Sequence, residues 1–181
     1  MSGRPETGAP DEAKRTAAAP TGAINLAPLP KDRLDLIADF ELPSEQHQFA
    51  YPPVRALAEA KGRRDGHLIQ ENDRVVGFFG IDPDYADAHD FAEPGSIGVR
   101  MFSVDHRHQG RGIASAACRQ FADYLPQHYP QAHTCYLTVN HRNPGAKAVY
   151  LKSGFTDTGE DYLGGASGPQ YIMRLDLSGR R

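Results

Sequence analysis

The chain has 181 residues, which suits one domain of ordinary size with a tail. Hydrophobic residues make up 39% and charged residues 24%, and the formal net charge is −3, so the strongly basic character of a nucleic-acid-binding domain is missing. No apolar run is long enough to span a membrane, and the polar N-terminus has no signal-peptide core. We therefore expect a cytoplasmic protein that binds neither nucleic acid nor a membrane.

The N-terminal segment 1–22 is rich in Ala, Gly, Pro and Thr and has little apolar content, so it is predicted to be a disordered tail. Residues 23–178 are predicted to form a single domain. This domain opens with a short strand at Ile24. Helical spacing of apolar residues predicts a short helix over 31–40 and another over 54–60, the second ended by Gly62.

The remainder of the chain carries most of the strand signals. Strands are predicted over 67–71, 74–81, 96–104, 134–139, 155–160 and 170–177, and helices over 112–125 and 144–152. The first two of these strands form a predicted hairpin, and the acidic, turn-rich segment 82–95 is predicted to be a loop or an insertion. The order indicates a mixed α/β (α+β) domain with antiparallel pairs at each end and helix crossovers in the middle.

One segment combines features of an anion-binding loop. After a predicted strand, two glycines alternate with basic and amide residues where a helix begins. The candidate residues are Arg107, His108, Gln109, Gly110, Arg111, Gly112 and Ile113. Glycine lets the backbone approach a bulky anion, and the first N–H groups of a helix lack internal partners and attract negative charge. The segment is therefore predicted to hold a pyrophosphate, with side-chain charge from the two arginines.

Two other phosphate-binding loops fit this segment poorly. A Walker A loop needs Gly-Lys followed by Ser or Thr, and the chain contains no such run. A dinucleotide fingerprint needs Gly or Ala where Ser115 stands, and an acidic residue about twenty positions on, whereas the later strand ends in Asn140. The pattern Arg/Gln-x-x-Gly-x-Gly/Ala is matched at every fixed position by 107–112.

A second motif completes the pattern. The segment 143–155 reads Asn-x-x-Ala-x-x-x-Tyr-x-x-x-Gly-Phe, about thirty residues after the loop. With these two motifs in this order, the chain resembles the GNAT superfamily of N-acetyltransferases over residues 24–177. The resemblance implies a GNAT-type mixed, splayed, mostly antiparallel sheet flanked by helices, with acetyl-CoA as co-substrate in the opening.

The acceptor is less sharply indicated. The segment 41–50 is similar to the early helix of the bacterial spermine/spermidine acetyltransferase branch, which implies a polyamine or a similar small primary amine. An antibiotic amine, a protein amine and a non-catalytic module that senses acyl-CoA remain alternatives. The superfamily also makes a homodimer possible.

The resemblance also implies roles for residues outside the loop. The backbone of Phe102, Ser103 and Val104 would align the pantetheine and polarise the thioester carbonyl. Tyr150 would be the general acid that protonates the departing thiolate, although its helical spacing also fits a core aromatic residue. Asn143 is predicted to cap its helix, with a contact to the coenzyme as a further possibility.

The general base and a metal have weaker signals. Glu41, Glu45 and Asp82 are candidate bases by position, although acidic residues in such segments are usually solvated. The chain has eight histidines but no zinc-binding pattern, so no metal site is predicted. Cys118 and Cys135 are expected in the core, because direct acetyl transfer needs no enzyme nucleophile.

Overall fold

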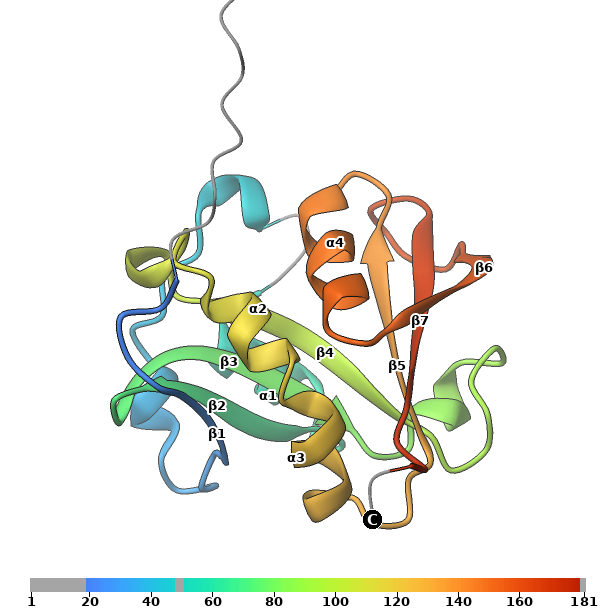
Figure 1. Ribbon diagram of the computed structural model, residues 1–181, viewed down its shortest axis with the longest axis horizontal. Helices are drawn as coiled ribbons and strands as arrows, with labels where there is room; N and C mark the ends of the chain where they lie inside the picture. The colour runs from blue at the N-terminus through green and yellow to red at the C-terminus, as the bar shows by residue number, and fades with distance from the viewer. Residues whose placement is uncertain (1–18, 48–50, 180–181) are drawn as a thin grey trace, which may run out of the picture.

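A computed structural model describes residues 19–47 and 51–179, with Glu45 described in its backbone alone. The first 18 residues of the expected tail, and residues 48–50 of the polyamine-like segment, lie outside the described residues. In the described part, seven strands form one sheet in the order β1-β2-β3-β4-β5-β7-β6 (Figure 1). Neighbouring strands are antiparallel except β4 and β5, which are parallel. The expected mixed, mostly antiparallel sheet is thus confirmed.

The elements follow one another in an order close to the predicted one. The strands are β1 (Ile24–Pro28), β2 (Asp65–Glu71), β3 (Arg74–Asp82), β4 (Ile97–Val104), β5 (Thr134–Asn140), β6 (Thr156–Tyr162) and β7 (Gln170–Asp176). The α-helices are α1 (Pro53–Glu59), α2 (Ile113–Cys118), α3 (Phe121–His128) and α4 (Pro144–Lys152). Short 3-10 turns are η1 (Leu34–Ile37), η2 (Ser44–Gln46), η3 (Tyr85–Ala88) and η4 (His106–His108).

The main hydrophobic core lies between the sheet and the helices α2, α3 and α4. Alternate residues of a strand face opposite sides of the sheet, so the apolar strands β3, β4 and β5 can supply both faces. Phe79 of β3 packs against Phe121 of α3 with ring centroids 4.9 Å apart. Figure 1 shows α2 and α3 crossing one face of the sheet and α4 standing beside β5.

Two helix predictions are wrong in detail. The helix predicted over 112–125 is divided into α2 and α3, because the chain tightens at Gln120, whose N–H bonds to the Ala117 oxygen at 3.0 Å. The Gln120 side chain also bonds to the oxygen of Ile24 in β1, which fixes this turn against the sheet. The helix predicted over 31–40 is reduced to the short η1, and its apolar Leu34 is 41% exposed.

The insertion 82–95 covers the face of the sheet opposite α2 and α3. Tyr85 is 1% exposed and belongs to an apolar cluster with Tyr136 of β5 and Ile172 of β7. Phe91 packs edge-on against Tyr136 and Tyr162. The insertion is therefore a packed wall of the sheet and not a solvated loop.

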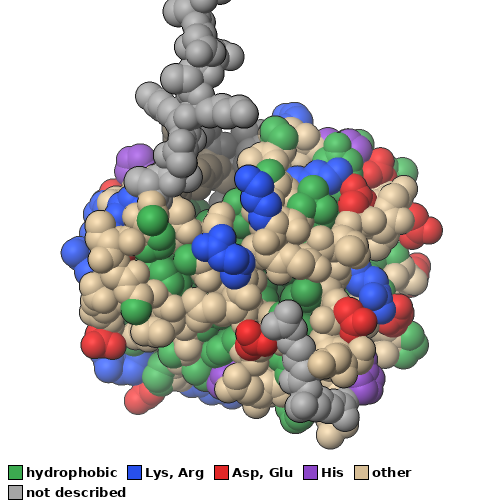
Figure 2. All heavy atoms as spheres, in the orientation of Figure 1, with side chains coloured by type: hydrophobic (Ala, Val, Ile, Leu, Met, Phe, Trp, Pro, Cys, Tyr) green, Lys and Arg blue, Asp and Glu red, His purple; other side chains and the backbone are tan. Residues whose placement is uncertain are grey.

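Charged side chains of both signs are interspersed on the molecular face seen in Figure 2. Among the described side chains on that face, no continuous basic patch stands out. Among residues 19–47 and 51–179, the structure has no helix long and apolar enough to cross a membrane.

Candidate active site

The parallel pair at the centre of the sheet separates soon after it forms. Strands β4 and β5 pair at Ile97↔Cys135 and Gly98↔Tyr136, and the following residues of β4 diverge from β5. A β-bulge lies on the other side of β4, where Met101 has a φ of 53° and the register against β3 shifts. Both features turn the backbone of β4 toward the opening, which confirms the splayed sheet.

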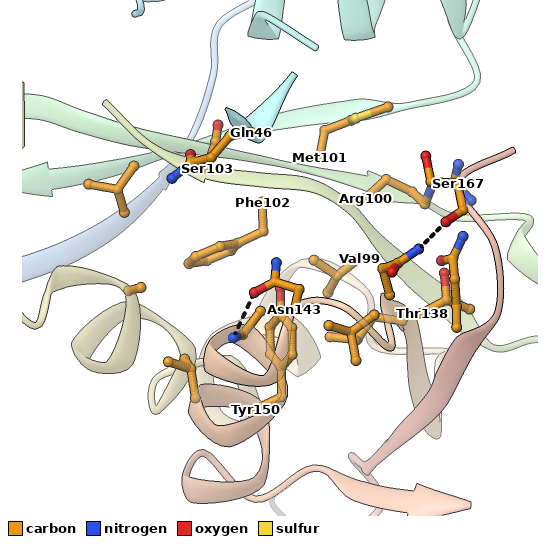
Figure 3. Close-up of a pocket in the computed structure, with 18 of the residues that line it drawn as sticks. Gln46, Val99, Arg100, Met101, Phe102, Ser103, Thr138, Asn143, Tyr150 and Ser167 are labelled. Carbon is orange, nitrogen blue, oxygen red and sulfur yellow. Dashed lines mark hydrogen bonds between the residues drawn. The ribbon is translucent and has the colours of Figure 1, made fainter. Parts of the chain in front are cut away.

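A pocket of about 930 Å³ fills this opening. Its walls come from β4, β5, the start of α4, the segment after β4, and the loop between β6 and β7. We call the part lined by residues 108–110, 112 and 113 the loop end, and the part lined by Arg100, Tyr162 and residues 164–167 the far end. Figure 3 shows Tyr150 of α4 and its N-cap residue Asn143 opposite Val99, Arg100 and Phe102 of β4.

The loop end has the backbone geometry of an anion site. Asp105 caps the turn η4 by accepting a hydrogen bond from the Arg107 N–H at 2.9 Å. Gly110 and Gly112 then adopt φ values of 76° and 70°, in the left-handed region that favours glycine. A Cβ at Gly110 would meet no atom within 4 Å, so its side faces open space, and α2 begins directly after Gly112.

The two loop arginines are engaged away from the pocket. Arg107 donates to Asp105 at 2.6 Å, and its guanidinium and N–H hold the pKa of Asp105 below its ordinary value. Arg111 pairs with Glu71 at 2.7 Å and also bonds to Thr21, at the end of the expected tail. Neither arginine lines the pocket, so in this structure the loop end offers backbone N–H groups in preference to arginine charge.

The other predicted loop residues do line the pocket. His108 is buried, and Gln109 lies beside it. The Gln109 side chain donates to the Val104 oxygen at 2.8 Å and contacts Gln46 of η2 at 3.1 Å. Ile113 is 2% exposed and anchors the start of α2 in the core. Gln109 therefore fixes the loop to β4.

The predicted β4 residues form one wall of the pocket. Phe102, Ser103 and Val104 all line it. The Ser103 hydroxyl is buried and has no hydrogen-bond partner among the described residues. A buried polar atom without a partner costs free energy, so this hydroxyl suits a polar ligand that would enter the opening. Together with the open backbone at Gly110, it fits the amide-rich arm and the pyrophosphate of acetyl-CoA.

Tyr150 lies across the pocket from this wall. It is 8% exposed, and its ring makes edge contacts with those of Phe102 and Phe155, with centroids 6.3 and 5.6 Å away. Burial raises the pKa of Tyr150, because the charged phenolate is disfavoured away from water, so the phenol holds its proton at neutral pH. Asn143 accepts from the Ala146 N–H at 3.2 Å, which confirms the predicted helix cap.

The three candidate bases are not gathered at the site. Asp82 is paired with Arg64 at 2.6 Å, on the β3 side of β4. Glu41 is exposed and does not line the pocket. The side chain of Glu45 lies outside the described part of the chain.

Sequence reasoning missed the far end of the pocket. Arg100 lines it from β4, and Tyr162 and the segment 164–167 line it from the β6–β7 connection. A long cationic residue within the apolar strand Ser-Ile-Gly-Val-Arg-Met-Phe was the available signal.

Metal and thiol chemistry find no support in the side-chain arrangement. No group of three His, Cys, Asp or Glu side chains that could hold a metal ion occurs within the described residues. Cys118 and Cys135 are both fully buried, and burial raises the pKa of each thiol.

Comparisons with known proteins agree with this geometry. The model of the acetyltransferase (GNAT) family matches residues 33–155. The uncharacterized N-acetyltransferase YbbJ of Bacillus subtilis is 28% identical over 156 residues, covering 84% of this chain and 97% of that protein. The spermine/spermidine N(1)-acetyltransferase of the same organism is 25% identical over 143 residues, covering 76% of this chain and 91% of that protein.

Solved structures share the fold. Spermidine N-acetyltransferase from Vibrio cholerae, in complex with CoA and spermine, aligns with a TM-score of 0.62 and 19% identity over 86% of this chain and 96% of that one. An aminoglycoside acetyltransferase in complex with coenzyme A aligns with a TM-score of 0.66 and 15% identity over 85% and 95%. Because the family model covers more than half of the sequence and the pocket suits acetyl-CoA, the chain belongs to the GNAT family and is an acetyl-CoA-dependent N-acetyltransferase.

Proposed function

We propose that this chain acetylates the primary amine of a small molecule by direct transfer, with Tyr150 as the general acid. The observation that carries the proposal is the position of Tyr150, buried in the pocket wall that faces β4. Acetyl-CoA supplies an activated acetyl thioester when it is bound. Tyr150 belongs to α4 and lines this pocket. Burial raises its pKa, so the phenol retains the proton that a general acid must donate.

Different residues bind the coenzyme, align the thioester and position Tyr150. The backbone N–H groups around Gly110 and Gly112 hold the pyrophosphate at the loop end. The backbone of Phe102 to Val104 aligns the thioester carbonyl along β4, beside the Ser103 hydroxyl. Asn143 orients the first turn of α4 through its cap to Ala146, which places Tyr150 two turns later.

The proton balance closes without an enzyme nucleophile. The acceptor nitrogen forms a bond to the acetyl carbon, the carbon–sulfur bond breaks, and the Tyr150 hydroxyl gives its proton to the departing sulfur. The acceptor is an ammonium ion at neutral pH, so its nitrogen loses two protons to water, one before it attacks and one after. The phenolate recovers one proton from water, so one proton is released overall. The products are the N-acetylated amine and the free thiol. Water is assigned this role because Asp82 is held by Arg64.

The acceptor class is supported unevenly. The Bacillus subtilis relative that acts on spermine and spermidine supports the polyamine predicted from the sequence. The described walls of the pocket, however, contain no carboxylate that could hold a polycation. The homodimer and the cytoplasmic location remain predictions from the sequence.

Replacing Tyr150 with Phe tests the proposed acid directly. We expect kcat for thiol release to fall by about 10²- to 10⁴-fold, because a positioned acid contributes on this order. The dissociation constant of CoA, measured by calorimetry, should stay unchanged. Tyr171→Phe is the matched control, because Tyr171 packs on His141 outside the pocket lining. Equal turnover in Tyr150→Phe and the wild type would contradict the assignment.

A further inference from the structure

Arg100 is an unusual residue for its position in the sheet. It follows Val99, which is 4% exposed in the main core, and it lies two residues beyond Gly98, where β4 and β5 are last paired. Strand alternation turns Arg100 to the face opposite Val99, toward the insertion 82–95. Placing a guanidinium at the centre of a sheet costs free energy unless the charge is paired and hydrogen-bonded.

No carboxylate neutralises Arg100 within the described residues. Other arginines near the sheet are paired: Arg64 with Asp82 at 2.6 Å and Arg111 with Glu71 at 2.7 Å. Arg100 has polar contacts with the ring nitrogen Nε2 of His89, at 3.5 Å, and with the hydroxyl of Tyr85. Arg is charged at every physiological pH and has five N–H donors. The donors that these contacts do not use are therefore available to a ligand.

The insertion 82–95 holds Arg100 in place. The His89 Nδ1 contacts the Tyr85 oxygen at 3.0 Å, so Nδ1 carries the proton and Nε2 is the acceptor that faces Arg100. The His89 ring also stacks on the Tyr85 ring, with centroids 3.9 Å apart. The Tyr85 hydroxyl is buried, and Arg100 opposes the rise in the Tyr85 pKa that burial causes. These contacts hold the guanidinium against the insertion 82–95, while Arg100 also lines the pocket.

The charged side chains among the described lining residues of the pocket have one sign. Arg100 and Arg142 line it, whereas none of its described lining residues is Asp or Glu. Arg142 donates to the Ser167 oxygen at 2.7 Å, which ties the β6–β7 loop to the far end. Figure 3 shows Arg100 and Ser167 at the same end, across from Tyr150. A polycation placed here would meet like charge, which disfavours it.

We propose that the acceptor amine carries a carboxylate, which Arg100 binds at the far end while the amine is acetylated. The inference rests on the proposed function and specifies its substrate class: a compact molecule of the amino-acid type. The planar guanidinium offers parallel donors that match a carboxylate in a bidentate pair. Such a pair would hold the acceptor by the group that does not react.

Matched pairs of amines test the proposal, because the members of each pair differ in the carboxylate alone. Lysine with cadaverine, histidine with histamine, and tyrosine with tyramine are compared in kcat/KM for thiol release, with spermidine added. We expect the carboxylated member of the preferred pair to be better by at least about tenfold. Arg100→Gln should abolish this preference, and Arg100→Lys should keep part of it. Arg119→Gln, an exposed residue outside the pocket lining, is the control.

A readout of binding separates the outcomes. The acetylated products of each pair are tested by saturation-transfer NMR with CoA present, and the carboxylated product should bind to the wild type and not to Arg100→Gln. Preference for spermidine or the decarboxylated amines would overturn the proposal, as would equal loss for both members of a pair in Arg100→Gln. If none of the amines supports thiol release, the proposed function is contradicted. Product binding would then still show whether Arg100 holds a carboxylate.

Discussion

At the loop end of the pocket, Gly110 and Gly112 present backbone groups, whereas at the far end Arg100 presents a side chain fixed by His89. The loop end comes from one continuous segment, because its geometry depends on left-handed glycines and a helix that starts beside them. The far end is assembled from β4, the insertion 82–95 and the β6–β7 connection. The coenzyme can therefore be held by the backbone of one segment, while the acceptor is held by side chains that come from several segments.

The largest effect is expected from a side chain placed in the loop end. Gly110→Val introduces a β-branched residue at a φ of 76° and fills the space in front of the loop. Losing two charge-assisted hydrogen bonds to the pyrophosphate would weaken CoA binding on the order of a thousandfold, about 4 kcal/mol. Titration calorimetry with CoA measures this loss.

The matched control is Gly62→Val. Gly62 has a φ of 80°, and a Cβ there would also meet no atom within 4 Å, but it lies outside the pocket lining. The two variants impose similar backbone strain, so a difference in CoA affinity reports the site alone. Equal affinities for CoA in both variants would break the comparison, because the loop backbone would then not be the binding element.

Acid should weaken the packing of α3 against the sheet. His67 of β2 contacts the hydroxyls of Tyr124 and Tyr129 at 2.7 and 2.8 Å, and so ties α3 to the sheet. Tyr129 donates to Asp65, so it accepts from His67 Nε2, and Tyr124 donates to Nδ1. Both ring nitrogens of a neutral His67 are thereby satisfied.

Burial, and then the charge of His128, lower the pKa of His67 to about 4 from an ordinary 6.5. Above pH 6.5 neither the folded nor the unfolded state is protonated at this residue, and the full stability is present. Between pH 6.5 and 4 the unfolded state binds the proton and the folded state does not, so the free energy of unfolding falls by about 3 kcal/mol. Urea unfolding across this range measures the fall, and His67→Phe should reduce the slope. An unchanged slope in that variant would contradict the assignment.

A smaller effect on CoA affinity shows whether Arg111 anchors the loop backbone or binds the phosphates with its own side chain. If Arg111 acts by anchoring the loop to Glu71, Arg111→Gln and Glu71→Gln should weaken CoA binding by the same few-fold, because either change breaks one contact. If Arg111 instead binds phosphate directly, Arg111→Gln should cost far more than Glu71→Gln. Calorimetry on both variants and on their combination separates these cases.

The difference between the two ends also explains how much the sequence could reveal. The loop 107–112 and the helix from Asn143 to Tyr150 were predictable, because glycine conformation, capping and helix starts are local properties. Local patterns also gave a wrong prediction at Gln120. The apolar spacing predicted one continuous helix there, but a contact to β1 divides it. The charge that the loop arginines were expected to give to the phosphates is instead taken up by Asp105 and Glu71.

The role of Arg100 was not predictable, because it depends on contacts distant in the sequence. His89 reaches Arg100 only once Tyr85 and Phe91 have packed on β5 and β6, and no periodicity marks this packing. The segment 82–95 is acidic in composition, but its residue that contacts Arg100 is His89. The net charge of a segment therefore does not predict which of its side chains will contact Arg100.

One two-dimensional ¹H–¹⁵N NMR titration tests the comparison most directly, because the same spectrum contains backbone amides and arginine Nε–H groups. On adding CoA, we expect the largest shifts at the amides of Gly110 and Gly112, with the Nε–H of Arg107 and Arg111 nearly unmoved. On then adding N-acetylated amino acid, the Nε–H of Arg100 should move. Shifts of the loop arginines with unmoved glycine amides would contradict the account, since the cofactor would then be held by side chains.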